Sequence, residues 1–290
     1  QVKINENRSL SPDDEYIISK LNQSIKDVET HLKKYRFNDA TLALYDFFWH
    51  SFCDRYLEYA KPYLYKGSKE EKEHILTVMH TVFKRALRLL HPFMPFMTEE
   101  LWEGMNYNYE YKRIMLSPWP NQLTSLTIDE NIVDYVEGKH DLIRIGRILR
   151  SDYNLNAKQV ANFILIAKNK YIEEQVLKDI DSIKSALKAD SIEVYIKMES
   201  EEIMPSGISE LGDLYMSIKE LINVESEINK TQNELSEVNK FLENVLKKLS
   251  NENFVSKAPV DVVRVQEERR DELTEKSKKL SSMLEMLKNV

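Results

Sequence analysis

Residues 250–263 read SNENFVSKAPVDVV and separate two long segments that carry heptad patterns. Pro259 cannot continue an incoming helix but suits the first turn of the next one, so this stretch predicts a turn. Apolar residues before the turn alternate at spacings of three and four, which is the pattern of a coiled-coil seam. The seam consists of Leu221, Val224, Ile228, Leu235, Val238, Leu242, Val245 and Leu249, with Thr231 filling one step.

The segment after the turn continues the seam more weakly. It offers Leu273, Leu280, Met283 and Leu287, with Lys276 in the gap and Arg269 and Arg270 near seam positions. Long Arg and Lys stems can cover apolar surface while their charged heads reach water. With roughly 30 residues in each arm, the pattern predicts an antiparallel hairpin about 45 Å long. A globular core does not need such an arm, so its length indicates that it extends to contact a binding partner.

Residues 11–120 show helical periodicity without strand-like alternation, which favours a helical bundle. The expected boundaries are helix starts at Ser11–Pro12, at the capping box Ser68–Glu71 and at Thr98, and a helix end before Pro92. A helix at about 38–65 is expected to bury an aromatic face. That face comprises Leu44, Phe48, Trp49, Phe52, Tyr56 and Tyr59.

The character of the sequence changes after residue 126, where a small α+β module is expected. The expected elements are a helix capped by Thr127 and Glu130 that ends near Ser151, strands at 160–167, 192–198 and 211–216, a helix at 170–188, and a loop at 199–210. The fold class is therefore mainly α. We expect a bundle at 1–126, the α+β module at 127–216 and the coiled-coil hairpin at 217–290.

The composition is that of a soluble, somewhat helix-rich protein, with 42% hydrophobic and 31% charged residues. No apolar run approaches the roughly 20 residues of a membrane span, and the start lacks a signal-peptide core. Cys53 is the single cysteine, which fits a reducing cytoplasm. The chain does not begin with Met, so we expect a piece of a longer protein. Its net charge of −7 argues against a nucleic-acid partner overall, although local basic stripes matter more.

A search for catalytic motifs finds almost nothing. No Gly-rich phosphate loop is present, and His74 and His80 are too far apart in sequence to share a face as zinc ligands. The acid pairs Asp13–Asp14 and Glu99–Glu100 lie in first helical turns, where they are expected to stabilise the helix dipole. We interpret Cys53 as a buried thiol and His91 as a packed or capping residue.

Basic residues are the stronger candidates for function, as contacts to RNA phosphates. The candidates are Arg144, Arg147 and Arg150, spaced by three on one helix; Lys247, Lys248 and Lys257 around the hairpin turn; and Arg36 and Arg88 in the bundle. Tyr35, Arg36 and Phe37 could stack a base, although Phe37 also suits a hydrophobic staple. For each basic group the alternative is a solvated polar face.

Several stretches resemble one enzyme family. RFNDATLALYDFFWHSFCDRYLEYAKPYL (36–64), LRLLHPFMPFMTEELW (87–102) and SPWP (117–120) resemble the anticodon-binding domain of class I aminoacyl-tRNA synthetases for branched aliphatic amino acids and methionine. IRIGRILRSDYNLNAKQV (143–160) and residues 214–263 resemble the C-terminal module and coiled coil of the valyl-tRNA synthetase family. The NENFVSKAP turn is the most specific motif and favours the valyl over the isoleucyl family.

The resemblance implies a tRNA-binding C-terminal portion of a valine–tRNA ligase, whose bundle meets the anticodon and whose coiled coil meets the tRNA elbow. The parent reaction joins valine to tRNA(Val) with ATP and Mg. The signatures HIGH and KMSKS do not occur here, so the resemblance implies no cofactor and no activity for this chain alone. Catalytic and editing domains of the parent chain are the implied protein partners, in a cytoplasmic monomer without membrane contact.

A rival interpretation is a protein-interaction module in which the hairpin binds another coiled coil without RNA. The net charge of −7 and the mixed charges of the arm favour this rival. The aromatic corner HPFMPF and the NENFVSKAP turn favour the synthetase.

Overall fold

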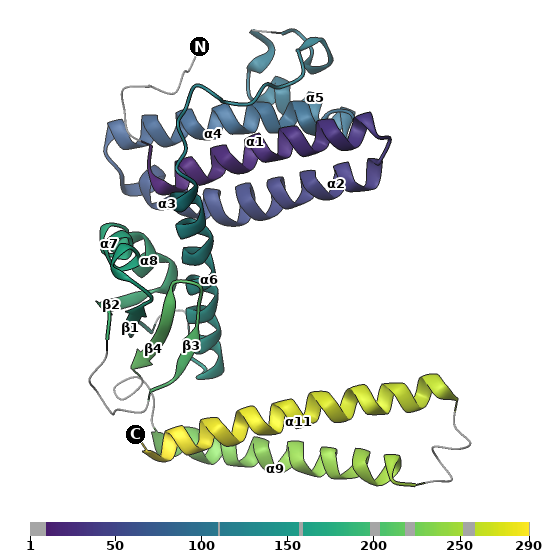
Figure 1. Ribbon diagram of the computed structural model, residues 1–290, viewed down its shortest axis with the longest axis vertical. Helices are drawn as coiled ribbons and strands as arrows, with labels where there is room; N and C mark the ends of the chain where they lie inside the picture. The colour runs from purple at the N-terminus through teal and green to yellow at the C-terminus, as the bar shows by residue number, and fades with distance from the viewer. Residues whose placement is uncertain are drawn as a thin grey trace. The chain divides into compact units, whose positions relative to one another are not determined.

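The computed structural model describes residues 10–109, 111–156, 159–197, 204–217, 224–251 and 259–289. They form a mainly α-helical protein with a small sheet, which confirms the predicted fold class (Figure 1). The chain divides into two compact units, residues 1–140 and 141–290, and the dividing point falls within helix α6 (Glu130–Asp152). The finer division into 1–126, 127–216 and 217–290 stays a prediction.

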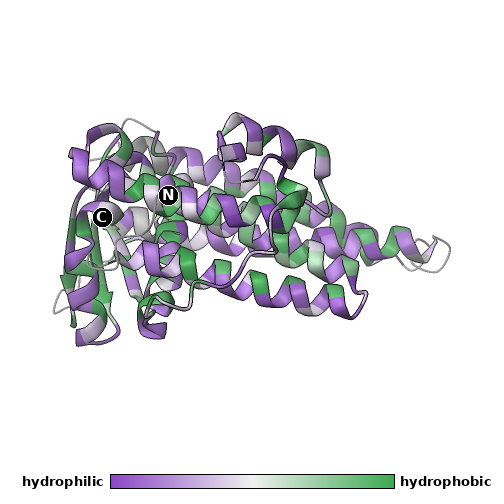
Figure 2. Ribbon diagram, turned by 90° about the horizontal axis from the view of Figure 1, so that it is seen from above, coloured by the Kyte–Doolittle hydropathy of each residue, from purple (hydrophilic) through white to green (hydrophobic). Residues whose placement is uncertain are grey.

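Helices α1 to α5 and the start of α6 make up the first unit. Their bounds are α1 Pro12–Lys33, α2 Phe37–Tyr45, η1 Asp46–Tyr56, α3 Leu57–Lys66, α4 Lys69–Leu90 and α5 Pro95–Gly104, followed by short 3₁₀ turns η2 Tyr107–Tyr109 and η3 Ile114–Leu116. Ser11 and Ser68 each accept the backbone N–H three residues on, which confirms both predicted caps. Hydrophobic residues recur along the helices between hydrophilic ones, as amphipathic helices require (Figure 2).

The core of the first unit joins α1, η1 and α4. Ile17, Leu21 and Val28 of α1 belong to one buried cluster with Phe52 of η1 and Val82 of α4. The spacing of four and seven along α1 places its three residues on one face of the helix. The predicted apolar stripe therefore builds this core.

The predicted helix at 38–65 has a π-helix in its middle. Helix α2 leads directly into η1, and the N–H of Leu57 donates to the carbonyl oxygen of Phe52, five residues earlier. The wider turn of a π-helix changes which residues face the core. Phe52 and Tyr56 are buried, whereas Trp49 is 51% exposed, so the expectation that Trp49 is buried is wrong.

Helix α5 begins earlier than the sequence predicts. Pro95 occupies its first turn, where the missing N–H of proline would have no partner. Thr98, the expected first residue, lies inside the helix and donates to the carbonyl oxygen of Met94 at 2.8 Å. His91 Nδ1 lies 2.8 Å from the Thr98 hydroxyl, in agreement with the packed role expected for His91.

The start of α6 also differs from the predicted capping box of Thr127 and Glu130. Asp129 accepts the backbone N–H of Asn131 at 2.9 Å and so occupies the capping position. Glu15 of α1 accepts the N–H of Asp129 at 2.9 Å. The helix therefore begins at Glu130, and Thr127 is not its cap.

The described part of the second unit contains a four-stranded sheet in the order β2-β1-β4-β3. The strands are β1 Ala161–Ala167, β2 Ala189–Tyr195, β3 Ser206–Ile208 and β4 Gly212–Ser217. Strands β1 and β2 are parallel, and β4 is antiparallel to both β1 and β3. The parallel pair needs a crossover, which α7 (Lys170–Lys178) and α8 (Ile180–Leu187) supply.

The three predicted strands are confirmed, although β2 begins at Ala189 instead of Ile192. The single helix predicted at 170–188 is two helices, because Asp179 ends α7 and begins α8. Strand β3 falls in the predicted loop, and three residues are too few to show an alternating pattern.

Helices α9 (Val224–Leu249) and α11 (Val260–Asn289) pack side by side and form the predicted antiparallel hairpin (Figure 1). Pro259 directly precedes α11, and its carbonyl oxygen accepts the N–H groups of Val262 and Val263. The helical path therefore stops before Pro259, as the sequence predicts. Leu221, Lys257 and the turn residues 252–258 lie outside the described residues, as do the side chains of Val224 and Leu287.

Both helices contribute buried residues to the seam of the hairpin. Val238 and Val245 of α9 and Leu280 and Met283 of α11 are buried, in agreement with the predicted pattern, and Leu284 of α11 is buried as well. Lys276 is exposed, and Ser277 next to it donates to the side chain of Asn239 at 2.7 Å. Lys276 thus lies beside the seam, where it pairs with Glu234 at 2.8 Å.

Candidate nucleic-acid interface

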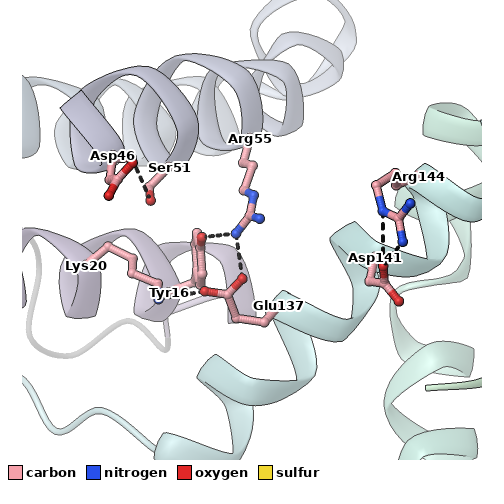
Figure 3. A network of polar contacts seen from close by, with 8 residues as sticks. All are labelled: Tyr16, Lys20, Asp46, Ser51, Arg55, Glu137, Asp141 and Arg144. Atoms are coloured by element: carbon pink, nitrogen blue, oxygen red, sulfur yellow. Dashed lines mark hydrogen bonds and ion pairs between the residues drawn. The ribbon is translucent and has the colours of Figure 1, made fainter. Parts of the chain in front are cut away.

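The three arginines on α6 do not share one exposed face. Arg144 is exposed and pairs with Asp141, with 2.7 Å between nitrogen and oxygen (Figure 3). Arg147 is also exposed and forms no ion pair with another residue of the described ranges. Arg150 is only 7% exposed. The expectation that three guanidinium groups track phosphates together is therefore wrong for Arg150.

Arg150 holds backbone carbonyl groups in place. Its guanidinium donates to the carbonyl oxygens of Gln159 at 2.6 Å, Asn156 at 3.1 Å and Lys188 at 3.4 Å. Burial lowers the pKa of Arg150 from its ordinary value, although an arginine remains charged. The residue ties the end of α6 to the segment before β1 and to the end of α8.

Two basic residues of α9, Lys247 and Lys248, lie close to the predicted turn of the hairpin. Lys247 pairs with Glu243 at 2.7 Å on the exposed surface, while Lys248 is exposed and forms no ion pair within the part of the chain that the structure describes. Exposed apolar side chains accompany them at this end of the hairpin: Phe241, Leu246, Val262 and Val265. Such a mixture of cations and apolar groups suits contact with both phosphates and unstacked bases.

Arg36 lies at the turn between α1 and α2, where it pairs with Asp39. Tyr35 and Phe37 beside it are 81% and 55% exposed, with ring centroids 6.4 Å apart. Phe37 is the first residue of α2 and too exposed for the hydrophobic staple considered from the sequence. The exposed rings leave the base-stacking role open to test.

Arg88 and its neighbours on α4 hold the chain segment that follows α5. Arg88 donates to the carbonyl oxygens of Lys84 and Pro118, each at 3.3 Å. Arg85 likewise donates to the carbonyl oxygen of Asn121 at 3.4 Å. The Lys84 ammonium lies 5.2 to 5.6 Å from the ring centroids of Trp102, Tyr107 and Tyr109. These contacts give the basic group on α4 a structural role.

Sequence reasoning missed an exposed aromatic pair on α2 and η1. The rings of Tyr45 and Trp49 are stacked, with centroids 6.2 Å apart and planes 5° from parallel, and both side chains are about half exposed. Their spacing of four residues was the available signal, but the α-helical pattern favoured burial of Trp49. Exposed rings of this kind are platforms on which single-stranded bases stack.

Sequence reasoning also missed a buried polar network at the start of α1. Asp13 pairs with Lys139 of α6 at 2.5 Å, and both side chains are almost fully buried. Asp14 accepts from the Tyr56 hydroxyl at 2.5 Å and lies 2.8 Å from Nε2 of His74. Both acids lie in the first turn of α1 as predicted, and the Asp14 carboxylate accepts the N–H of Ser11 in the capping box at 3.0 Å. Their buried partners give them a second role, in the core, that the sequence did not indicate.

The pKa of Asp14 responds to opposing effects. Burial raises it, but hydrogen bonds from His74, Tyr56 and Ser11 together outweigh burial and lower the pKa below its ordinary value. Because the folded pKa is lowered, Asp14 contributes stability above the ordinary carboxyl pKa. That contribution is lost as the pH falls through the lowered value.

A second polar cluster links α1, η1 and α6 (Figure 3). Glu137 accepts from Lys20 and from Arg55, each at 2.6 Å, and Arg55 also donates to the hydroxyl of Tyr16. Burial raises the pKa of Glu137, but Lys20 and Arg55 lower it by more. Structural ion pairs account for these shifts, so they do not indicate acid–base catalysis.

No other chemistry emerges from the described residues. Within the ranges that the structure covers, no three His, Cys, Asp or Glu side chains are grouped to hold a metal ion, and no helix is long and apolar enough to cross a membrane. Cys53 is half-buried, so the expectation of a fully buried thiol is wrong. Burial and the nearby Asp54 raise the pKa of its thiol, which agrees with an unreactive cysteine.

Comparison with known proteins finds two matching families. Residues 14–165 match the anticodon-binding domain of tRNA ligase, and residues 223–288 match the valyl tRNA synthetase tRNA binding arm. The first match covers more than half of the chain. The segment between the two matches, residues 166–222, contains α7, α8 and strands β2 to β4 and belongs to neither match.

Curated relatives carry the same two regions at their C-terminal part. The valine–tRNA ligase of Aquifex aeolicus is 31% identical over 97% of this chain and 25% of the relative. The enzyme of Geobacillus stearothermophilus is 31% identical over 95% of this chain and 31% of the relative. The enzyme of Carboxydothermus hydrogenoformans is 33% identical over 88% of this chain and 29% of the relative. The chain thus spans between a quarter and a third of the length of these relatives.

Proposed function

Since the chain belongs to the family of tRNA-ligase anticodon-binding domains, we propose how it binds tRNA. It corresponds to the C-terminal tRNA-binding region of valine–tRNA ligases. The helical bundle meets the anticodon loop, and the hairpin of α9 and α11 meets the elbow of tRNA(Val). The observation that carries the proposal is the presence of both RNA-directed regions in one chain.

Two anchoring points give the tRNA a fixed orientation. Binding energy from parts of a substrate far from the reacting bond can support the chemical step. We propose that the catalytic and editing domains of a valine–tRNA ligase act on the acceptor end while this region holds the rest, in a cytoplasmic monomer. The named relatives support this function over an isoleucyl enzyme or an RNA-independent interaction module.

ATP and Mg belong to the reaction that the relatives' name implies, and the residues of this chain do not fit them. Neither HIGH nor KMSKS occurs in the sequence. The four residues that start at Lys197 resemble KMSKS but do not match it. No step of the reaction is therefore assigned to these residues.

We expect this chain alone to catalyse no valine-dependent exchange between ATP and pyrophosphate. The physical reason is that the sequence contains no Gly-rich phosphate loop and neither of the signatures HIGH and KMSKS. Exchange is measured with radiolabelled pyrophosphate in the presence and absence of valine. A valine-dependent signal above the enzyme-free control would contradict the assignment of this chain to tRNA binding alone.

We expect charge reversal at the hairpin to weaken tRNA binding at low salt by at least about tenfold. The variant is Lys247→Glu with Lys248→Glu, and binding of a tRNA(Val) transcript is measured at two or more salt concentrations. Each lost phosphate contact should also flatten the slope of log affinity against log salt by somewhat less than one unit. Arg144→Glu with Arg147→Glu tests the second exposed basic group in the same way.

Lys278→Glu is the matched control, because Lys278 is exposed on the same hairpin but 18 positions after the first residue of α11. It should leave affinity and salt slope close to those of the unaltered chain. Unchanged affinity and slope in the Lys247/Lys248 variant, with an unchanged melting transition, would show that this end of the hairpin does not meet RNA.

A further inference from the structure

The four-stranded sheet of the second unit is covered by helices on one face. A Cβ atom added to Gly146 of α6 would lie 2.5 Å from Leu187 of α8 and 3.2 Å from Leu214 of β4, so both helices lie on the side of Leu214. Side chains of a strand alternate between its two faces. The residues that share this side of β1 and β4 are buried: Ala161, Phe163, Leu165, Ala167, Leu214 and Met216.

The opposite face of the sheet, called the open face below, carries no buried side chain among the described strand residues. Tyr195 of β2 and Ile208 of β3 are 45% and 79% exposed. Ile164, Ile166 and Tyr215 lie on the strands between them and are partly exposed. Contiguous exposed apolar and aromatic groups of this kind mark interaction surfaces.

The two tyrosines of the open face are separated by strand β1. Tyr195 lies opposite Ile166 of β1, and Tyr215 lies opposite Ile164 of the same strand. Neighbouring strands are about 4.8 Å apart, so the backbones of the two tyrosines are at least about 10 Å apart. The Tyr195 hydroxyl donates to Glu193, two residues earlier, at 2.8 Å, which directs its ring along β2. Each ring is therefore able to stack a planar group of its own.

Two lysines lie at the edge of the open face where β1 and β2 end. Lys168 and Lys197 follow the two strands and keep the alternation that places Ile166 and Tyr195 on the open face. Because β1 and β2 are parallel, their ends lie at the same edge of the sheet. Both lysines are exposed and form no ion pair with another residue in the described part of the chain. Their charges are therefore available to phosphate groups.

The acids of the open face limit where a chain of phosphates can lie. Glu193 and Asp213 are exposed on the strands themselves, whereas the lysines follow the strand ends. Repulsion by the two carboxylates confines phosphates to the edge with the lysines. A double helix carries phosphates along its whole outer surface, but an unpaired nucleotide can turn its base toward the rings while its phosphate stays at the edge. The charges thus favour a single strand.

We propose that the open face binds an unpaired RNA segment, with one base stacked on each of Tyr195 and Tyr215 and phosphates against Lys168 and Lys197. Four-stranded sheets with exposed aromatic side chains bind single-stranded RNA in other proteins. A protein partner would also cover the isoleucines, but it gives no role to the unpaired lysines beside the rings. The inference goes beyond the proposed function, because most of this sheet lies between the two family matches.

We expect Tyr195→Ala to lower the affinity of the chain for a single-stranded RNA of about ten nucleotides roughly tenfold, the effect of losing one stacked base. Tyr195→Phe should keep the affinity, because phenylalanine retains the ring. Binding is measured by fluorescence anisotropy of the labelled RNA. Photocrosslinking of the same RNA with 5-iodouridine incorporated should label Tyr195 or Tyr215 and so locate the contact. The RNA annealed to its complement should bind equally well to Tyr195→Ala and to the unaltered chain.

Tyr171→Ala is the matched control, because Tyr171 is 39% exposed on α7, away from the open face. It should leave the affinity for the single strand unchanged. Lys168→Gln with Lys197→Gln should flatten the slope of log affinity against log salt by about 1.4 units, since each contact with a single strand contributes about 0.7. Lys178→Gln, at an exposed lysine of α7, should leave that slope unchanged.

Unchanged affinity in Tyr195→Ala, with unchanged hydrogen exchange in β1 and β2, would overturn the inference and leave the open face to a protein partner. Equal losses in Tyr195→Ala and Tyr171→Ala would overturn it as well. Neither result touches the proposed function, because a tRNA(Val) transcript would still bind through the bundle and the hairpin. A chain that binds the single strand through Tyr195 but does not bind the transcript would contradict the proposed function alone.

Discussion

Replacing Lys139 with methionine is expected to lower the free energy of unfolding of the first unit by about 3–5 kcal/mol. The Lys139 ammonium lies 2.5 Å from the Asp13 carboxylate, and the two side chains are 1% and 3% exposed. Methionine fills a similar volume but leaves a buried carboxylate without its cation. Removing one member of a buried pair is far more costly than removing both.

Tryptophan fluorescence during urea unfolding measures this effect. The three tryptophans, Trp49, Trp102 and Trp119, all lie in the first unit, so the signal reports on that unit alone. The double variant Asp13→Asn with Lys139→Met should recover most of the lost stability. Lys33→Met is the matched control, because Lys33 pairs with Glu29 on the surface and should cost at most about 1 kcal/mol. Equal losses at Lys139 and Lys33 would contradict the prediction.

Arg150→Met is expected to destabilise the second unit by about 2–4 kcal/mol without weakening tRNA binding by the folded chain. The change removes three hydrogen bonds that the guanidinium donates to backbone carbonyl oxygens, and a hydrogen bond to a charged group contributes about 1.5–3 kcal/mol. The carbonyl oxygens of Asn156 and Lys188 keep a second donor, the N–H groups of Gln159 and Ala161, so the loss stays below the sum of the three. Arg150→Lys should recover only part of the loss, because a single ammonium does not reproduce the planar fork of arginine.

Hydrogen exchange of the backbone amides in β1 and β2 measures the stability of the second unit, and tryptophan fluorescence should stay unchanged as an internal control. Affinity for tRNA is measured at a temperature where the variant is folded. A tenfold loss of tRNA affinity with unchanged hydrogen exchange would contradict this prediction. It would indicate that Arg150 contacts RNA.

The helices, caps and strands that follow a regular local pattern of residues could be predicted from the sequence. The seam of α9 follows a heptad over most of its length, so Val238 and Val245 reveal their buried positions without further information. Serine caps at Ser11 and Ser68 depend only on residues within one turn. Strand β1 is likewise readable from its own β-branched and aromatic residues.

Features that depend on distant residues could not be predicted. Asp13 and Lys139 are 126 positions apart, and nothing near either residue in sequence indicates their pairing. Arg150 resembled its neighbours Arg144 and Arg147, and only the chain folding back over the end of α6 distinguishes it. Trp49 was misplaced because the expected periodicity assumed α-helical turns, which the π-helix does not have.

The π-helix has a consequence for how this chain tolerates changes in length. Each hydrogen-bonded ring in a π-helix encloses one residue more than in an α-helix, because N–H groups reach back five positions instead of four. A single-residue deletion within 46–56 can therefore be absorbed by a return to α-helical pairing, with α3 keeping its orientation. The same deletion within α1 would rotate every later residue of that helix by about 100° and take its apolar stripe out of the core. Insertions and deletions that persist during evolution of this region are thus expected to gather at η1.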